Sequence, residues 1–121
     1  MRLVTAKRLS SIVTALVLAG ASAVAQTAQE RQWCENETGM TVDQRIDGCS
    51  AVIKAGREKG EKLAEAFNNR GIAYRLKGDH ERAIADYDQA LKLAPSAEGY
   101  FNRGNAHLAK RDYDRAIDDY N

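Results

Sequence analysis

The sequence repeats itself with an offset of 33 residues. The tripeptide Asn-Arg-Gly at 69–71 recurs at 102–104, and Glu-Arg-Ala-Ile at 81–84 recurs as Asp-Arg-Ala-Ile at 114–117. A period of this length is typical of stacked helical hairpins. One hairpin cannot bury its apolar side alone, so neighbouring hairpins must stack to form a core. The repeat therefore predicts an all-α fold, a short stack of antiparallel helix hairpins, whose working surface is an open groove rather than an enclosed active site.

The beginning of the chain has the pattern of an export signal. A few basic residues precede an uncharged, largely apolar stretch at 9–25, and Ala23 and Ala25 form a small-x-small cleavage site before Gln26. A membrane anchor needs about 20 strongly apolar residues, and this stretch is shorter and carries Ser, Thr and Gly. We therefore expect residues 1–25 to be removed and the mature protein to be exported, periplasmic or secreted, with no stable membrane span.

Removal of this segment changes the charge balance. The whole chain has 18 Lys and Arg against 17 Asp and Glu, and without the three basic residues of the signal 15 remain against 17, a net charge of −2. Domains that bind nucleic acid normally carry a basic excess gathered on one face. The composition therefore does not predict a nucleic-acid partner.

Both cysteines, Cys34 and Cys49, lie in the part that remains after cleavage. In an oxidising compartment a disulfide is their expected state, and closing a loop of about 16 residues stabilises a fold by roughly 3 kcal/mol in the chain-entropy model. A redox-active pair normally has C-x-x-C spacing, and a zinc site needs further Cys or His ligands nearby. His80 and His107 are far along the chain. We expect a structural disulfide, with free thiols as the alternative, and no metal or other cofactor.

The start of the mature chain is polar and is expected to be irregular over 26–39, where Trp33 is the main apolar residue. A helix is predicted next, because the Thr-Val-Asp-Gln sequence at 41–44 has the form of a capping box. Apolar residues then recur at helical spacing until Gly56, and Cys49 shares their face. A disulfide from Cys49 would fold the polar segment across this face and hold Trp33 as a lid near the end of the stack.

Two further helices are predicted before the second copy of the repeat begins. One runs over about 61–77, and the next ends near Leu93, because the residue before Pro95 avoids helical geometry. Gly71 lies inside the first of them, where glycine costs roughly 1 kcal/mol relative to alanine. Its recurrence as Gly104 therefore needs a packing reason, and we expect close approach of a neighbouring helix.

The spacing of seven residues matches the signature of a known repeat, W-x-x-L-G-x-x-Y followed by A, F, A and P. These residues are Phe67, Gly71, Tyr74, Ala83, Tyr87, Ala90 and Pro95. On this pattern the chain resembles the tetratricopeptide repeat family over 64–96 and, incompletely, over 97–121. The resemblance implies a right-handed superhelical stack that binds other proteins. Arg70 and Arg103 stand where the family usually has Leu, and His107 replaces an aromatic residue.

The resemblance extends weakly toward the N-terminus. The segment 46–53 resembles 84–91, so the helix that contains it looks like the second half of a divergent hairpin. The exported region is similar to that of small secreted tetratricopeptide proteins of alphaproteobacteria. The expected organisation is a signal at 1–25, a disulfide-tethered leader and divergent helix at 26–60, and the repeat domain at 61–121.

The resemblance implies that the first helix of each hairpin lines the groove. The residues expected to contact a peptide there are Asn68, Asn69, Ile72, Arg75, Phe101, Asn102 and Asn105. Asn69 and Asn102 recur one repeat apart, and an amide carries the donor and the acceptor that pair with the backbone of an extended peptide. The alternative is that each Asn is a solvated surface residue. Arg70, Arg75 and Arg103 are candidates for attracting acidic segments.

These features predict a non-catalytic scaffold of the cell envelope that binds a protein or peptide segment in its groove. Self-assembly is the alternative, because the chain stops at Asn121 and leaves Ile117 and Tyr120 in an incomplete hairpin. Either the sequence is a piece of a longer one, or this edge meets another copy. An enzyme is a distant alternative: the acidic pairs of the helices have no accompanying nucleophile, phosphate loop or metal spacing, so no catalytic residue is assigned.

Overall fold

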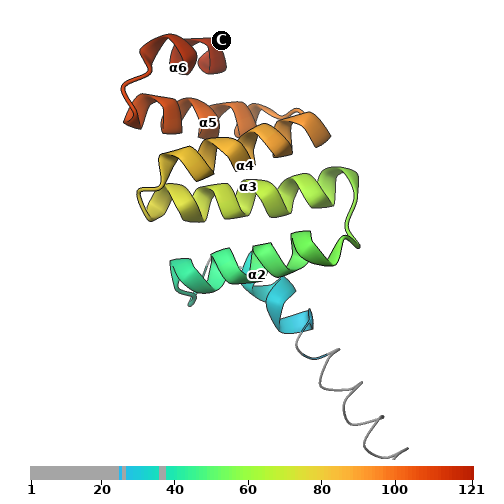
Figure 1. Ribbon diagram of the computed structural model, residues 1–121. Helices are drawn as coiled ribbons and strands as arrows, with labels where there is room; N and C mark the ends of the chain where they lie inside the picture. The colour runs from blue at the N-terminus through green and yellow to red at the C-terminus, as the bar shows by residue number, and fades with distance from the viewer. Residues whose placement is uncertain (1–24, 26, 36–37) are drawn as a thin grey trace, which may run out of the picture.

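The computed structural model describes residues 25, 27–35 and 38–121. The predicted signal at 1–25 therefore lies, apart from Ala25, outside the described residues. The described part is a stack of antiparallel helices with no strand (Figure 1), so the expected all-α fold is confirmed. A helical segment at 27–35 comes first. The helices that follow are α2 (Val42–Ala55), α3 (Gly60–Leu76), α4 (His80–Leu93), α5 (Ala97–Ala109) and α6 (Tyr113–Tyr120).

Local sequence signals set where the helices begin and end. The predicted capping box is present at α2: Gln44 N donates to Thr41 Oγ1 at 3.1 Å, and Thr41 N donates to Gln44 Oε1 at 3.0 Å. These bonds satisfy backbone donors that a helix start otherwise leaves free. Gly56 ends α2 in the left-handed conformation, with φ 65°. Asp79 and Asp112 cap α4 and α6 in the same manner as each other, as expected from the repeat.

The leader is helical over 27–35, so the expectation of an irregular leader is wrong. Ala, Gln, Glu and Arg in this segment are good helix formers, and the segment packs against α2. At the contact, a Cβ atom on Gly48 would lie 2.6 Å from Trp33 Cβ and 2.6 Å from the Glu30 carbonyl oxygen. Gly48 thus allows the two helical backbones to approach closely. Tertiary contact, which hydrophobic periodicity does not report, accounts for the helix.

The predicted disulfide is present between Cys34 and Cys49, which are 2% and 0% exposed. Cys49 lies on α2 at the position that Tyr87 occupies on α4 in the weak internal alignment. The disulfide therefore joins the leader to α2 at the position where, in the first regular repeat, the Tyr87 ring packs against α3. Ala66 of α3 packs against the buried sulfur atoms and closes this small core.

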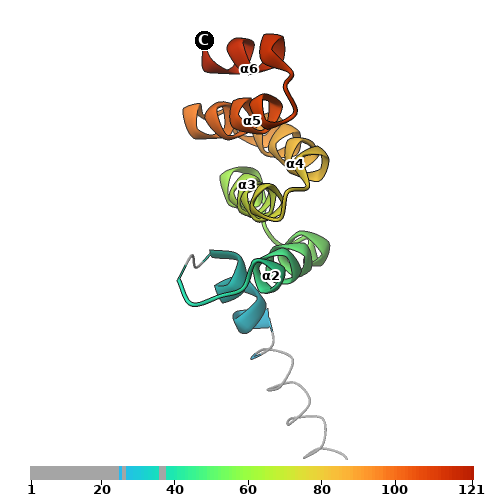
Figure 2. The same cartoon turned by 90° about the vertical axis from the view of Figure 1, so that its left-hand side faces the viewer.

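The helices pack as successive neighbours. α3 packs against α4, α4 against α5 and α5 against α6, while α2 lies against α3. α3 also contacts α5 directly, so these two helices share one side of the stack, with α4 set toward the other side (Figure 2). The shared side of α3 and α5 is called the groove face below.

Glycine and tyrosine interlock inside each hairpin. A Cβ atom on Gly71 would lie 2.7 Å from the Tyr87 ring, and one on Gly104 would lie 2.7 Å from the Tyr120 ring. This confirms that the repeated glycine allows close approach of a neighbouring helix. The two tyrosines differ in surroundings: Tyr87 is fully buried and packs with Ala106, whereas Tyr120 is 45% exposed.

This difference predicts unequal costs for two equivalent substitutions. Gly71→Ala forces the buried Tyr87 ring to move, and overpacking of this kind costs about 1–3 kcal/mol, of which helix propensity returns roughly 1 kcal/mol. We therefore expect a net loss of up to about 2 kcal/mol in the free energy of unfolding. For Gly104→Ala, the exposed Tyr120 ring can turn away, so we expect a change within about 0.5 kcal/mol of zero. Urea unfolding followed by circular dichroism measures both, and equal losses would contradict the packing argument.

Candidate functional site

The groove face carries large apolar side chains that no other helix covers. Leu76 of α3 is 59% exposed, and Phe101 and Leu108 of α5 are 57% and 46% exposed. Ile72 is only half-buried and packs against the core at its inner side. Exposed apolar side chains on two helices that share one side of a stack are typical of a protein-binding surface.

Amide side chains join α3 to α5 across this face. Asn102 Nδ2 donates to Asn68 Oδ1 at 3.2 Å, and Asn68 Nδ2 donates to Glu98 Oε1 at 3.2 Å. Asn102 is 9% exposed. Asn105 accepts a hydrogen bond of 2.7 Å from the Tyr120 hydroxyl. The structure therefore brings Asn68 and Asn102 together, and the amides of all three residues are already engaged in contacts between helices.

Asn69 binds a main-chain carbonyl of the leader. Its Nδ2 atom donates to the Cys34 carbonyl oxygen at 3.2 Å. The equivalent nitrogen of Asn102 also points back toward the preceding unit of the stack, where Asn68 accepts its hydrogen bond. The recurring Asn pair thus uses its donors inside the chain, and the partner of Asn69 is backbone.

Arg70 and Arg103 are not available to attract acidic segments, because each binds an aspartate of its own hairpin through two nitrogens. Arg70 donates to Asp86 at 2.8 Å through both Nε and Nη2, and Arg103 donates to Asp119 at 2.9 and 2.6 Å. These hydrogen bonds raise the pKa of both guanidinium groups, against the opposing effect of burial. These pairs were not predicted from the sequence, although aspartate follows arginine by 16 residues in both copies.

The same arginines also reach the preceding hairpin. Arg70 Nη1 donates to Ser50 of α2 at 3.1 Å, and Arg103 Nη1 donates to Asp88 of α4 at 2.7 Å. Ser50 and Asp88 occupy matching positions in the weak internal alignment. Each arginine therefore ties two successive outer helices together.

Arg75 and Tyr87 leave buried polar atoms without partners next to the groove face. Tyr87 Oη and Arg75 Nε are both buried and make no hydrogen bond within the described residues. Burial raises the pKa of the Tyr87 hydroxyl, and the neighbouring Arg75 guanidinium partly opposes that rise. In the second copy the Tyr120 hydroxyl has Asn105 as its acceptor. Ile72 stands at the equivalent position of α3 and offers no acceptor.

A cavity of about 620 Å³ opens at the C-terminal end of the stack. It is lined by Ala97, Tyr100, Phe101, Asp118, Asp119, Tyr120 and Asn121. The Phe101 and Tyr120 rings lie with their centroids 6.0 Å apart in a tilted arrangement, a spacing typical of aromatic pairs. This end of the stack therefore presents both aromatic rings and acidic side chains.

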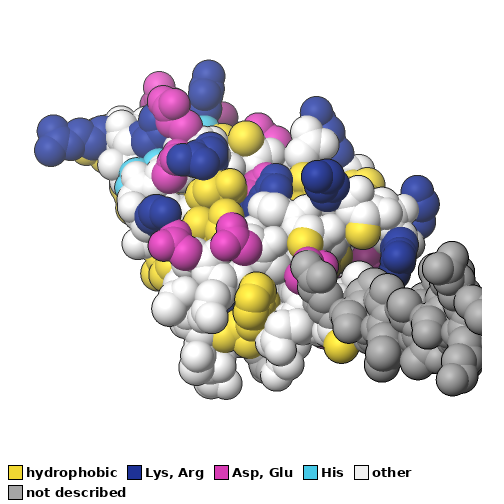
Figure 3. Space-filling model, turned by 60° about the horizontal axis from the view of Figure 1, so that its bottom comes forward, with side chains coloured by type: hydrophobic (Ala, Val, Ile, Leu, Met, Phe, Trp, Pro, Cys, Tyr) yellow, Lys and Arg dark blue, Asp and Glu magenta, His cyan; other side chains and the backbone are white. Residues whose placement is uncertain are grey.

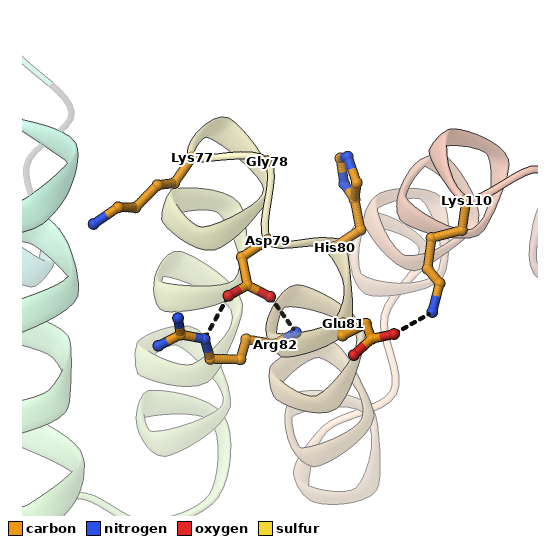
Figure 4. A pocket seen from close by; sticks show the side chains of 7 residues that line it. All are labelled: Lys77, Gly78, Asp79, His80, Glu81, Arg82 and Lys110. Carbon is orange, nitrogen blue, oxygen red and sulfur yellow. Dashed lines mark hydrogen bonds and ion pairs between the residues drawn. The ribbon is translucent and has the colours of Figure 1, made fainter.

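A second hollow, of about 500 Å³, lies at the turn between α3 and α4 (Figure 4). Its charged side chains pair with one another: Asp79 accepts from the backbone and Nε of Arg82, and Lys110 lies 3.1 Å from Glu81. Little free charge remains to bind a ligand here. The groove face is the stronger candidate site.

Charge is mixed over the surface as a whole. On the face shown in Figure 3, Lys and Arg side chains are interspersed with Asp and Glu, and apolar side chains lie between them. Within the described residues, no three His, Cys, Asp or Glu side chains are grouped to hold a metal ion. In the same part of the chain, no helix is both long enough and apolar enough to cross a bilayer.

Comparison with known families finds two matches. The family model described as Tetratricopeptide repeat matches residues 64–96, and a second model of the same description matches residues 97–121. No curated protein matches the chain. The matched ranges contain α4, α5, α6 and all of α3 except its first four residues, and these helices form the groove face and its outer support.

Proposed function

We propose that this chain is a non-catalytic scaffold, because residues 64–96 and 97–121 match the tetratricopeptide repeat, which generally mediates protein–protein interaction. It binds an extended segment of a partner protein along the groove face. Export to an oxidising compartment of the cell envelope is part of the proposal. The buried Cys34–Cys49 disulfide fits such a compartment, and the expected signal at 1–25 would deliver the chain there.

The observation that carries the proposal is the exposure of Phe101 on α5. Its side chain is 57% exposed, it directly precedes Asn102 in the sequence, and it lies where the groove face meets the C-terminal cavity. Covering a Phe side chain fully contributes about 1.5–3 kcal/mol, and neighbouring amides supply the polar contacts that an extended backbone needs. Aromatic anchors of this kind commonly dominate the binding energy of an interface.

The contact of Asn69 with the leader gives independent support. Its amide already holds the carbonyl oxygen of Cys34 at 3.2 Å. An asparagine at this repeat position therefore has the geometry to bind main chain without regard to the side chain attached. Asn105, one turn beyond Asn102, accepts from Tyr120 through its oxygen and keeps its amide nitrogen for such a contact.

Peptides selected from a displayed random library on the oxidised chain test the proposal. We expect Phe101→Ala to weaken binding of the selected peptides by about tenfold, the size typical of losing an aromatic anchor. Tyr113→Ala is the matched control, because Tyr113 is also an aromatic residue that is 57% exposed, but on α6. We expect it to leave affinity within about twofold. Isothermal titration calorimetry measures both, and equal affinity of wild type and Phe101→Ala would refute binding at the groove face.

Self-association is the second candidate function. Ile117 and Tyr120 are 55% and 45% exposed at the C-terminal end, beside the cavity of about 620 Å³. Light scattering of the samples used for calorimetry separates the two functions. A monomeric mass at the concentration where peptides bind excludes assembly as the basis of binding.

A further inference from the structure

Arg75 has a charge that its surroundings do not compensate. The arginines at 31, 70, 82, 103 and 115 each have a carboxylate within ion-pair distance. Among the described residues, no carboxylate lies within that distance of Arg75, and its side chain is half-buried on the groove face. Arg57 and Arg111 have no ion pair either, but they are exposed, whereas the Arg75 Nε atom is buried and makes no hydrogen bond within the described residues. A partner's carboxylate would supply the missing acceptor.

The Tyr87 hydroxyl adds a second donor at the same place. Tyr87 is fully buried, and its hydroxyl makes no hydrogen bond within the described residues. The tyrosine rings of both copies lie against their glycines at the same distances, so the hydroxyl of Tyr87 reaches the level of Ile72, as that of Tyr120 reaches Asn105. A buried hydroxyl without a partner is unfavourable, because its bond to water is lost and not replaced. Arg75 lies beside it, so one acceptor placed at Arg75 serves both groups.

We propose that the segment bound on the groove face, as argued under Proposed function, carries an Asp or Glu side chain whose carboxylate binds Arg75, with the Tyr87 hydroxyl behind it. The carboxylate pairs with the guanidinium of Arg75, and the Tyr87 hydroxyl donates to the same carboxylate. This contact requires Arg75 to turn toward the ligand, because Tyr87 is fully buried beside it. In the complex, the Arg75 Nε atom and the Tyr87 hydroxyl each gain an acceptor that they lack within the described residues.

The polarity of the groove face fixes where the acidic residue lies. Arg75 is in the last turn of α3, whereas Glu98, bound by Asn68, is in the first turn of α5. A ligand carboxylate is repelled by Glu98 and attracted by Arg75. Leu76 and Leu108 are exposed beside Arg75, so the bound segment continues past the acidic residue to cover them. The carboxylate therefore comes from a side chain and not from the C-terminus of the ligand.

A double-mutant cycle tests this inference. One member of the cycle is Arg75→Leu, which the helix should tolerate because Leu108 occupies the equivalent position of α5. The other is a change of Glu to Gln, or Asp to Asn, in a selected peptide whose C-terminus is amidated. We expect wild type to prefer the acidic peptide by about tenfold, and Arg75→Leu to reduce this preference to about twofold or less. The amide form of the peptide should bind both proteins alike.

Tyr87→Phe is the second variant, because it removes only the hydroxyl. Loss of an unsatisfied buried hydroxyl should leave the fold as stable as before or more stable. Its effect on the acid preference is expected to be a reduction of about threefold. A role of Tyr87 in packing alone would leave the preference unchanged.

The outcomes separate this inference from the proposed function. If Phe101→Ala weakens binding but Arg75→Leu leaves the acid preference unaltered, the acidic ligand is refuted while the groove face stands. Selected peptides without acidic residues, or an acid preference that vanishes when the C-terminus is amidated, also refute it. If Phe101→Ala has no effect, binding at the groove face itself is refuted, and this inference with it.

Discussion

Replacing Asp86 with alanine is expected to lower the free energy of unfolding by about 2–4 kcal/mol, because breaking a buried ion pair leaves an uncompensated charge. Asp86 and Arg70 have side chains that are 7% and 20% exposed, and two hydrogen bonds of 2.8 Å join them. The bond from Arg70 to Ser50 survives the substitution and limits the loss. Urea unfolding followed by circular dichroism measures the change.

An exposed ion pair provides the control. Lys77 and Asp43 are 2.6 Å apart, closer than Arg70 and Asp86, yet their side chains are 54% and 71% exposed. Solvent screening leaves such pairs with about 0–1 kcal/mol, so Lys77→Gln should cost at most about 1 kcal/mol. The exposure of the side chains, rather than the distance between them, therefore determines which pair contributes more to stability. Losses of equal size for Asp86→Ala and Lys77→Gln would contradict this ranking.

Removing the disulfide is the second large change. Cys34→Ala combined with Cys49→Ala should lower the free energy of unfolding by about 3 kcal/mol, from the added freedom of the unfolded chain. For a domain of this size that corresponds to a fall of roughly 12–24 °C in the melting temperature. The helical segment at 27–35 should lose its protection against hydrogen exchange, because the bond holds it against α2.

Reduced wild type is the control for this variant. Dithiothreitol should lower the melting temperature of wild type to that of the double variant and leave the double variant unchanged. Protection of 27–35 that persists after reduction would show that the packing on Gly48 holds the leader without the bond.

Much of the fold could be predicted because its causes are local or periodic. The period of 33 residues predicts stacked hairpins, and Gly71 predicts the close approach that the Tyr87 ring makes. The Thr41 capping box depends on two side chains three residues apart, so it can be recognised from four consecutive residues. The cysteine pair needed only the assumption of an oxidising compartment.

The leader and the arginine pairs could not be derived in the same way. Whether the polar segment at 27–35 is helical depends on the contact with Gly48, which lies on another element. Arg70 and Arg103 are charged residues at positions that a hydrophobic pattern treats as surface. Their partial burial is explained only when the paired aspartates, Asp86 and Asp119, are considered with them. Comparing the two copies for charges at equal spacing, and not only for apolar residues, would have found the pairs.

The groove residues, too, could be predicted only in part. Their placement on α3 and α5 follows from the repeat, but the partners of their amides do not. Asn69 binds the leader, which lies outside the repeats, and Asn102 binds Asn68, whose counterpart in the second copy is Phe101. Differences between the copies, rather than their likeness, decide what each amide contacts.

The covalently held leader makes the two ends of the molecule unlike. It covers the outer side of α2, whereas the far end presents Tyr120 and the α5–α6 cavity (Figure 1). If copies associate through this C-terminal surface, as in the second candidate function, the contact would use the same surface on both molecules and would close as a symmetric pair. The bond between Cys34 and Cys49 keeps the leader on α2, so the surface at α2 stays different from the surface at α6.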